Sequence, residues 1–84
     1  MPTELEKLKK ELYELEKEKA ELKKLRQAKI ELLKTKLEML PSRFASEHPV
    51  VYSLIAEIEE YTKKINKINS MIAKIKARIN ILEE

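Results

Sequence analysis

The sequence predicts an all-α protein: a two-helix antiparallel coiled-coil hairpin that assembles into a four-helix bundle. Two observations lead to this prediction. From Val51 to Leu82, every alternating step of three and four residues falls on an apolar or aromatic residue. The chain also contains no glycine, and its only internal break is a short stretch bracketed by Pro41 and Pro49. A single hairpin domain over residues 1–84 follows from this pattern.

Composition excludes several classes of function. The chain has 84 residues, no cysteine and a net charge of +3, and 39% of its residues are charged. Without cysteine there is no disulfide framework and no thiolate metal site. Without glycine there is no glycine-rich phosphate loop. No apolar run is long enough to be a signal peptide or a membrane span, so we expect a cytoplasmic protein.

The first helix is expected over about residues 3–40. Thr3 and Glu6 fit a capping box at its start. Leucines then recur at heptad spacing as far as Leu22. Beyond Leu22 the apolar series is displaced by four residues, which predicts a stutter that locally relaxes the supercoil. The members of this displaced series are Ile30, Leu33, Leu37 and Leu40. Lys19, Arg26 and Lys29 lie near the seam, where long basic side chains can lay their stems along it and keep their charged ends in water.

The turn is expected over residues 41–49, which read PSRFASEHP. A proline disfavours the helical conformation of the residue before it, so Leu40 and His48 are natural helix boundaries. Between them we expect a short helical turn over Ser42–Glu47. Phe44, the only phenylalanine, is expected to fold over the end of the apolar seam.

The second helix is expected over about residues 50–83, with Pro49 in its first turn. Its apolar ladder lies on one face and forms a continuous seam, which needs a partner helix. The predicted interface residues on this helix are Val51, Leu54, Ile58, Ile65, Ile68, Ile72, Ile75, Ile79 and Leu82. Those on the first helix are Leu5, Leu8, Leu12, Leu15, Leu33 and Leu37.

The charge pattern favours the same antiparallel pairing. Residues 4–21 carry seven acids against five lysines, whereas residues 23–36 carry six bases and one acid. The second helix has acids near its start and six bases over residues 63–78. Folding the chain at the turn therefore brings each basic half against the more acidic half of the other helix. Each exposed pair contributes only about 0.3–0.5 kcal/mol, so charge sets orientation more than stability.

The second helix is wider than one seam. Apolar residues flank its ladder or lie beyond it, namely Val50, Ile55, Met71 and Ile81. Isoleucine at both core positions of a heptad favours three or four strands over two. We therefore expect a homo-oligomer, with two hairpins forming the bundle, and a structural role in oligomerisation or protein interaction. One alternative is a monomeric adaptor hairpin whose apolar face docks on a larger partner protein.

Nucleic-acid binding is the other alternative. The basic stretches Lys23–Lys36 and Lys63–Arg78 would together form a stripe that binds phosphates. The candidate contacts on the second helix are Lys63, Lys64, Lys67, Lys74, Lys76 and Arg78. Against this alternative, the bases are spread around several helix faces, and acids of the first helix neutralise many of them.

Residues with catalytic or metal-binding potential are few. His48 is the only histidine, and together with Glu47 it falls short of a metal site. We interpret His48 as a boundary residue at the entry to the second helix. Glutamates spaced by three or four, such as Glu14 and Glu18, are interpreted as a solvated face. No catalytic, cofactor-binding or metal-binding residue is assigned, and we expect no enzymatic activity.

The stretch SRFASEHPVVYSLIAEIEEY, Ser42–Tyr61, resembles the turn into a coiled-coil helix in the polysaccharide chain-length determinant family. In that family a His-Pro-x-Val step often precedes a heptad run. The resemblance covers under a quarter of the chain, and the family's membrane helices and mixed domain have no counterpart in this sequence. We interpret it as convergence and infer no function from it.

Overall fold

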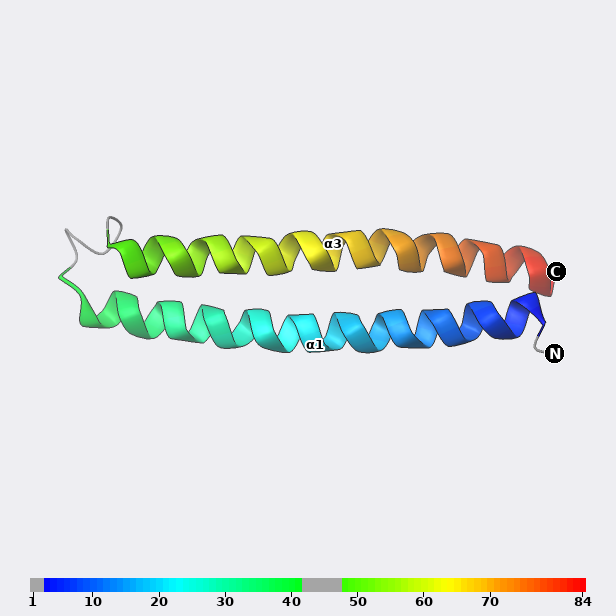
Figure 1. Cartoon of the computed structure of the whole chain (residues 1–84), viewed down its shortest axis with the longest axis horizontal. Helices are drawn as coiled ribbons and strands as arrows, with labels where there is room; N and C mark the ends of the chain where they lie inside the picture. Colours follow the sequence, from blue (N-terminus) through cyan, green and yellow to red (C-terminus); the bar gives the residue numbers. More distant parts are fainter. Residues whose placement is uncertain (1–2, 42–47) are drawn as a thin grey trace.

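The structure, a computed structural model, describes residues 3–41 and 48–84. It contains two long helices, α1 (Glu4–Met39) and α3 (Pro49–Glu83), which lie side by side and run in opposite directions (Figure 1). The prediction of an all-α helical hairpin is confirmed. The hairpin measures 60 × 16 × 16 Å, and α1 begins at the same extremity at which α3 ends.

Thr3 begins α1 as its N-cap residue. Its backbone is extended, and its hydroxyl oxygen Oγ1 accepts a hydrogen bond from the backbone N–H of Glu6 at 3.1 Å. This bond satisfies one of the N–H groups that a helix start leaves without a partner. The helix ends at Met39 because Leu40, which precedes Pro41, is extended.

His48 starts α3 through its side chain. Its Nδ1 accepts a hydrogen bond from the backbone N–H of Val50 at 3.2 Å. Pro49 occupies the first turn of the helix, where its missing N–H leaves no donor unpaired. The structure therefore gives His48 the boundary role expected from the sequence. The helical turn expected over Ser42–Glu47 and the expected position of Phe44 lie outside the described residues.

The ladder of α3 faces α1 along almost its whole length. Seven of its predicted interface residues are buried, namely Val51, Leu54, Ile65, Ile68, Ile72, Ile75 and Ile79. Ile58 is half-buried. Leu82 is exposed, because it lies in the last turn of α3 at the open end of the hairpin.

The ladder of α1 includes charged residues as well as leucines, and it extends along the whole helix. Its buried and half-buried residues follow alternating steps of three and four without interruption from Leu5 to Leu40, with Ile30 as the one addition. Four of these steps carry long cationic side chains, namely Lys19, Arg26, Lys29 and Lys36. The predicted stutter is therefore wrong. The register continues because the aliphatic stems of lysine and arginine pack along a seam while their charged ends reach water.

The predicted interface leucines of α1 differ in burial. Leu15 is buried, whereas Leu5, Leu8, Leu12 and Leu33 are half-buried. Leu37 is 40% exposed, because the neighbouring Lys36 takes that step of the ladder.

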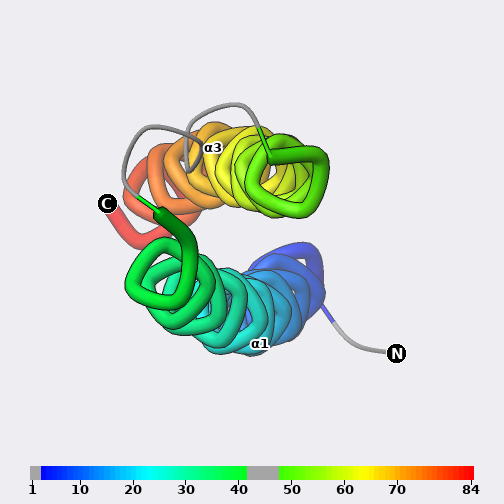
Figure 2. The backbone as a smooth tube through the Cα atoms, turned by 90° about the vertical axis from the view of Figure 1, so that its left-hand side faces the viewer, coloured from blue at the N-terminus to red at the C-terminus, as the bar shows by residue number. Residues whose placement is uncertain are grey.

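The most continuous part of the core lies in the half of the hairpin farther from the turn. Leu15 packs there with Ile68, Ile72, Ile75 and Ile79, and four partly buried leucines of α1 pack against this cluster. Figure 2 shows that the two helices wind around one another along the hairpin. Winding is what a shared heptad repeat requires, since an unbent α-helix would turn its apolar face away from its partner.

Candidate association surface

Two flanks border the seam, and each is made of positions that repeat every seven residues on both helices. Flank 1 consists of Glu4, Glu11, Glu18, Leu25, Leu32 and Met39 of α1 with Val50, Glu57, Lys64, Met71 and Arg78 of α3. Flank 2 consists of Lys9, Glu16, Lys23, Ile30 and Leu37 of α1 with Ile55, Thr62, Asn69, Lys76 and Glu83 of α3. In an antiparallel pair, each flank of one helix lies beside the equivalent flank of the other.

Ion pairs between the helices show which positions meet in the half farther from the turn. On flank 1, Arg78 Nη2 lies 3.0 Å from Glu4 Oε1. On flank 2, Lys76 Nζ lies 3.8 Å from Glu16 Oε1. The acidic start of α1 thus meets the basic end of α3, as the charge pattern predicts. All four side chains are exposed, so these pairs orient the helices and add little stability.

Lys29 makes the corresponding pair in the half nearer the turn. Its Nζ lies 3.0 Å from Glu57 Oε2, and this hydrogen bond, together with the negative charge of Glu57, raises the pKa of Lys29 above its ordinary value of 10.5. Arg26 Nη1 donates a hydrogen bond to Thr62 Oγ1 at 3.2 Å, and Thr62 donates to the backbone C=O of Ile58 at 3.0 Å. These contacts hold two cationic side chains at the seam.

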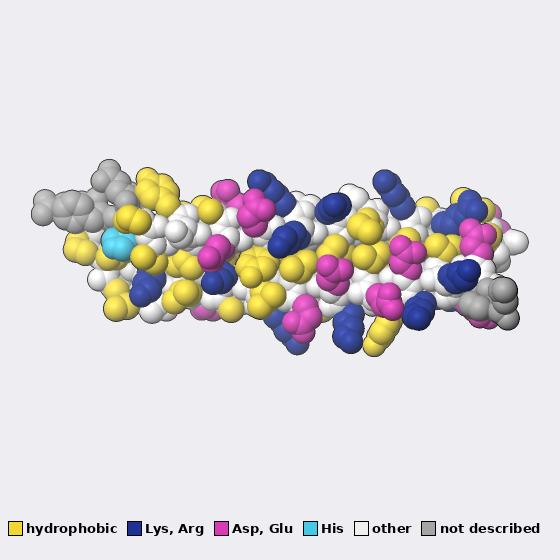
Figure 3. Space-filling model, viewed as in Figure 1, with side chains coloured by type: hydrophobic (Ala, Val, Ile, Leu, Met, Phe, Trp, Pro, Cys, Tyr) yellow, Lys and Arg dark blue, Asp and Glu magenta, His cyan; other side chains and the backbone are white. Residues whose placement is uncertain are grey.

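Large apolar side chains remain exposed on the hairpin, and most of them lie in the half nearer the turn. In that half they are Leu25, Leu32, Leu37, Met39, Val50, Tyr52 and Ile55, whereas the other half exposes Tyr13, Met71, Ile81 and Leu82. On flank 1 of α1, three apolar residues thus take the positions that three glutamates hold in the other half. Figure 3 shows apolar side chains gathered between the helices, above all toward the turn.

Two open grooves lie along flank 1. The first has a volume of about 360 Å³ and is lined by Lys29, Ala56, Glu57, Glu60, Tyr61 and Lys64. The second has a volume of about 380 Å³ and is lined by Leu15, Glu18, Lys64, Lys67, Ile68 and Met71. Lys64 borders both grooves, and its Nζ lies 5.9 Å from the ring centroid of Tyr61, within cation–π distance. Grooves between helical ridges are where side chains of another helix pack.

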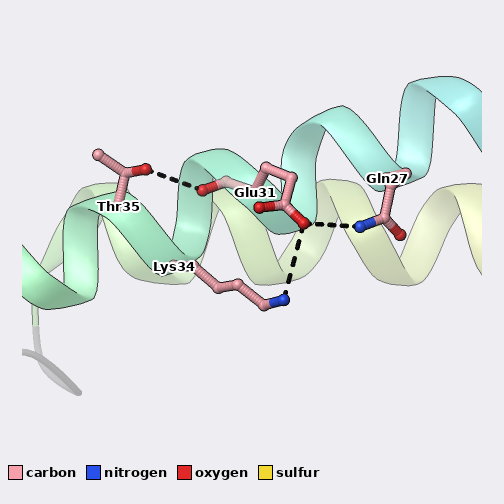
Figure 4. Close-up of polar contacts among 4 residues, drawn as sticks. All are labelled: Gln27, Glu31, Lys34 and Thr35. Carbon is pink, nitrogen blue, oxygen red and sulfur yellow. Dashed lines mark hydrogen bonds and ion pairs between the residues drawn. The ribbon is translucent and has the colours of Figure 1, made fainter.

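The outer face of α1 has a different character. Glu31 accepts a hydrogen bond from Gln27 Nε2 at 2.8 Å and lies 3.6 Å from Lys34 Nζ (Figure 4). Thr35 Oγ1 donates to the backbone C=O of Glu31 at 3.1 Å. These four side chains are exposed and paired within their own helix, so the outer face of α1 around Glu31 presents polar groups rather than an apolar surface.

The candidate nucleic-acid contacts do not gather on one surface of the hairpin. Lys76 and Arg78 form ion pairs on opposite flanks, and Lys63 lies 3.4 Å from Glu60. Within the described residues, no ion pair involves the remaining candidates, Lys64, Lys67 and Lys74. Acidic side chains of both helices therefore interrupt the basic stripe that the sequence alternative requires.

Leu25, Leu32 and Met39 are not among the residues that the hydrophobic ladder predicts. Their spacing of seven residues was the available signal, together with their position immediately before Arg26, Leu33 and Leu40 of the ladder. Arg26 and Lys29, by contrast, lie at the seam as the sequence indicates for them and for Lys19.

Neither helix is long and apolar enough to cross a membrane. Within residues 3–41 and 48–84, no group of three or more potential metal ligands of the histidine, cysteine or carboxylate type comes together. No protein-family model matches the chain, and no curated protein or solved structure shows significant similarity to it. The resemblance of Ser42–Tyr61 to the chain-length determinant family thus receives no support from these comparisons.

Proposed function

We propose that this chain is a non-enzymatic self-association module, in which hairpins pack together through the apolar surface beside the seam. The observation that carries the proposal is the exposure of Leu25, Leu32 and Met39 next to a seam that the hairpin has already closed. Burial of apolar surface stabilises an assembly by about 25 cal/mol per Å². A second hairpin would remove from water the surface that one hairpin leaves exposed.

The modest core of the single hairpin supports the same function. Within α1 only Leu15 is buried, and the other steps of its ladder are half-buried. Domains of this size often depend on disulfides, metals or oligomerisation, and this chain has no cysteine. Isoleucines at both core positions of α3 also favour more than two helices.

The dimensions of the hairpin suit a stable interface. A flat face of 60 × 16 Å covers about 1,000 Å², more than the roughly 800 Å² per partner of a standard interface. Leu25, Leu32, Met39 and Val50 are 47%, 41%, 71% and 40% exposed. Together they expose about two whole side chains, whose burial would contribute at most about 3–6 kcal/mol per copy. Association costs a comparable amount in lost freedom, so we expect assembly to be reversible and concentration-dependent.

The test is the solution mass of the untagged chain, measured by light scattering and sedimentation equilibrium over a range of concentrations. We expect the mass of a dimer or a larger assembly, with helical content checked by circular dichroism. A monomer at every concentration would overturn the proposal and favour an adaptor that docks on a larger protein. Nucleic-acid binding that weakens steeply with salt would instead favour the basic surface. Location in the cytoplasm stays a prediction from the sequence.

A further inference from the structure

We infer that two copies of this chain pack through flank 1 with their turns at the same end of the dimer. In this arrangement α1 of each copy lies over α3 of the other. The inference rests on the proposed self-association and adds which surface is used and in which orientation.

Flank 1 is favoured over flank 2 by its apolar content and its shape. Flank 1 exposes five large apolar residues, namely Leu25, Leu32, Met39, Val50 and Met71, whereas flank 2 exposes two, Leu37 and Ile55. Both grooves described above open on flank 1, which supplies two or more of the residues that line each of them. A surface with apolar projections and adjacent grooves can pack against a second copy of itself, as a two-fold interface requires.

The orientation follows from the way flank 1 changes along the hairpin. Its α1 residues are apolar near the turn and acidic near the other end. With the turns together, Met39 lies near Val50 of the second copy and Glu11 lies near its Arg78, while Leu25 and Leu32 lie level with the groove between its Glu57 and Lys64. With the turns apart, α1 would lie over α1, and the carboxylates of one copy would cover the exposed leucines of the other. Burying carboxylates against leucines is costly, so the first orientation is favoured.

In this orientation, the first groove lies at the same position along the long axis as the exposed leucines of the second copy. Within one hairpin, Arg26 contacts Thr62 and Lys29 contacts Glu57, so residues 25–32 of α1 lie level with about residues 56–63 of α3. A two-fold axis parallel to the hairpin keeps these heights unchanged between copies. Leu25 and Leu32 of the second copy therefore lie level with the first groove, between Glu57 and Lys64.

A matched pair of leucines tests the choice of flank. Leu32 on flank 1 and Leu37 on flank 2 lie on the same helix and are 41% and 40% exposed. We expect Leu32→Lys to weaken dimerisation by about tenfold or more, and Leu37→Lys to change it by about twofold or less. Sedimentation equilibrium gives the dissociation constants, and circular dichroism of each variant verifies that the hairpin is folded. Equal weakening by both changes, or a larger effect of Leu37→Lys, would overturn the choice of flank 1.

A distance measurement tests the orientation. The chain has no cysteine, so Glu38→Cys supplies a single attachment site for a spin label on an exposed position near the turn. In the dimer we expect a label-to-label distance comparable to twice the 16 Å width of the hairpin. A distance approaching its 60 Å length would show that the turns lie apart and would overturn the orientation while leaving self-association intact. A monomeric wild-type chain would overturn both the proposed function and this inference.

Discussion

Replacing Lys19 by leucine should stabilise the hairpin, because Lys19 occupies a step of the seam where a wholly apolar side chain fits better. Lys19 lies on the ladder between Leu15 and Leu22 and is half-buried. No ion pair of the described residues involves its ammonium group. The substitution therefore adds apolar surface to the seam without leaving a charged partner unpaired.

The size of the effect follows from the burial of this position. Complete burial of a leucine side chain contributes about 1.5–3 kcal/mol, so a half-buried position should gain about 1 kcal/mol. For a chain of this length, that gain raises the melting temperature by about 4–8 °C. Thermal and urea unfolding should be followed by circular dichroism at several protein concentrations, because association also contributes to apparent stability.

Lys17→Leu is the matched control for this prediction. Lys17 lies two residues away on the same helix, is exposed and does not belong to the ladder. We expect Lys17→Leu to change stability by less than about 0.5 kcal/mol. If both variants were equally stable, or if Lys19→Leu were less stable than the wild type, the continuous ladder of α1 would be refuted.

Three further predictions test the seam. Leu33→Ala should lower the free energy of unfolding by about 1–2 kcal/mol because Leu33 is half-buried, and Leu37→Ala should lower it clearly less. Equal losses of stability in urea unfolding would instead support the stutter. Ile68→Asp should unfold or dissociate the assembly, since it replaces a buried core residue by a carboxylate with no partner, at a cost of about 3 kcal/mol or more. An unchanged mass and melting curve of that variant would contradict the packing. The raised pKa of Lys29 means that its pair with Glu57 stabilises the fold below about pH 10.5 and ceases to do so as the pH rises through the higher folded-state pKa. Stability measured from neutral to strongly alkaline pH should therefore fall more in the wild type than in Lys29→Met, and parallel curves would show that the pair contributes nothing.

The sequence allowed the seam of α3 to be predicted and misplaced the seam of α1, for one physical reason. Every step of the α3 ladder is apolar or aromatic, so hydropathy and geometry coincide there. In α1, steps such as Arg26 and Lys36 carry charged ends on apolar stems, and a search for apolar residues passes over them. Such a search moves instead to Ile30 and Leu37. In the structure α1 stays in register with α3, and this register places Lys36 rather than Leu37 on the ladder.

The exposed surface was harder to predict from the sequence than the seam. Along flank 1 of α1, a seven-residue repeat changes from glutamates to Leu25, Leu32 and Met39 at mid-helix, so it is not a hydrophobic repeat over the whole helix. The relative height of the two helices was also missing from the sequence. It depends on cross-helix contacts such as Lys29 with Glu57, and it brings Lys29, Glu57 and Lys64 together around one groove.

The two halves of the hairpin differ in how completely a single chain buries their apolar side chains. Away from the turn, Leu15 and the isoleucines of α3 form an apolar core, and charged residues occupy most positions of the two flanks. Toward the turn, the α1 side of the seam includes Arg26, Lys29 and Lys36, while the flanks carry exposed leucines and a methionine. That half therefore has cations facing its partner helix and apolar side chains facing water, the reverse of what an isolated pair of helices favours. A further copy over the flanks would convert this exposed apolar surface into core and leave the cationic ends at its margins. Under the proposed self-association, most of the apolar surface that a second copy would bury thus lies in the half nearer the turn.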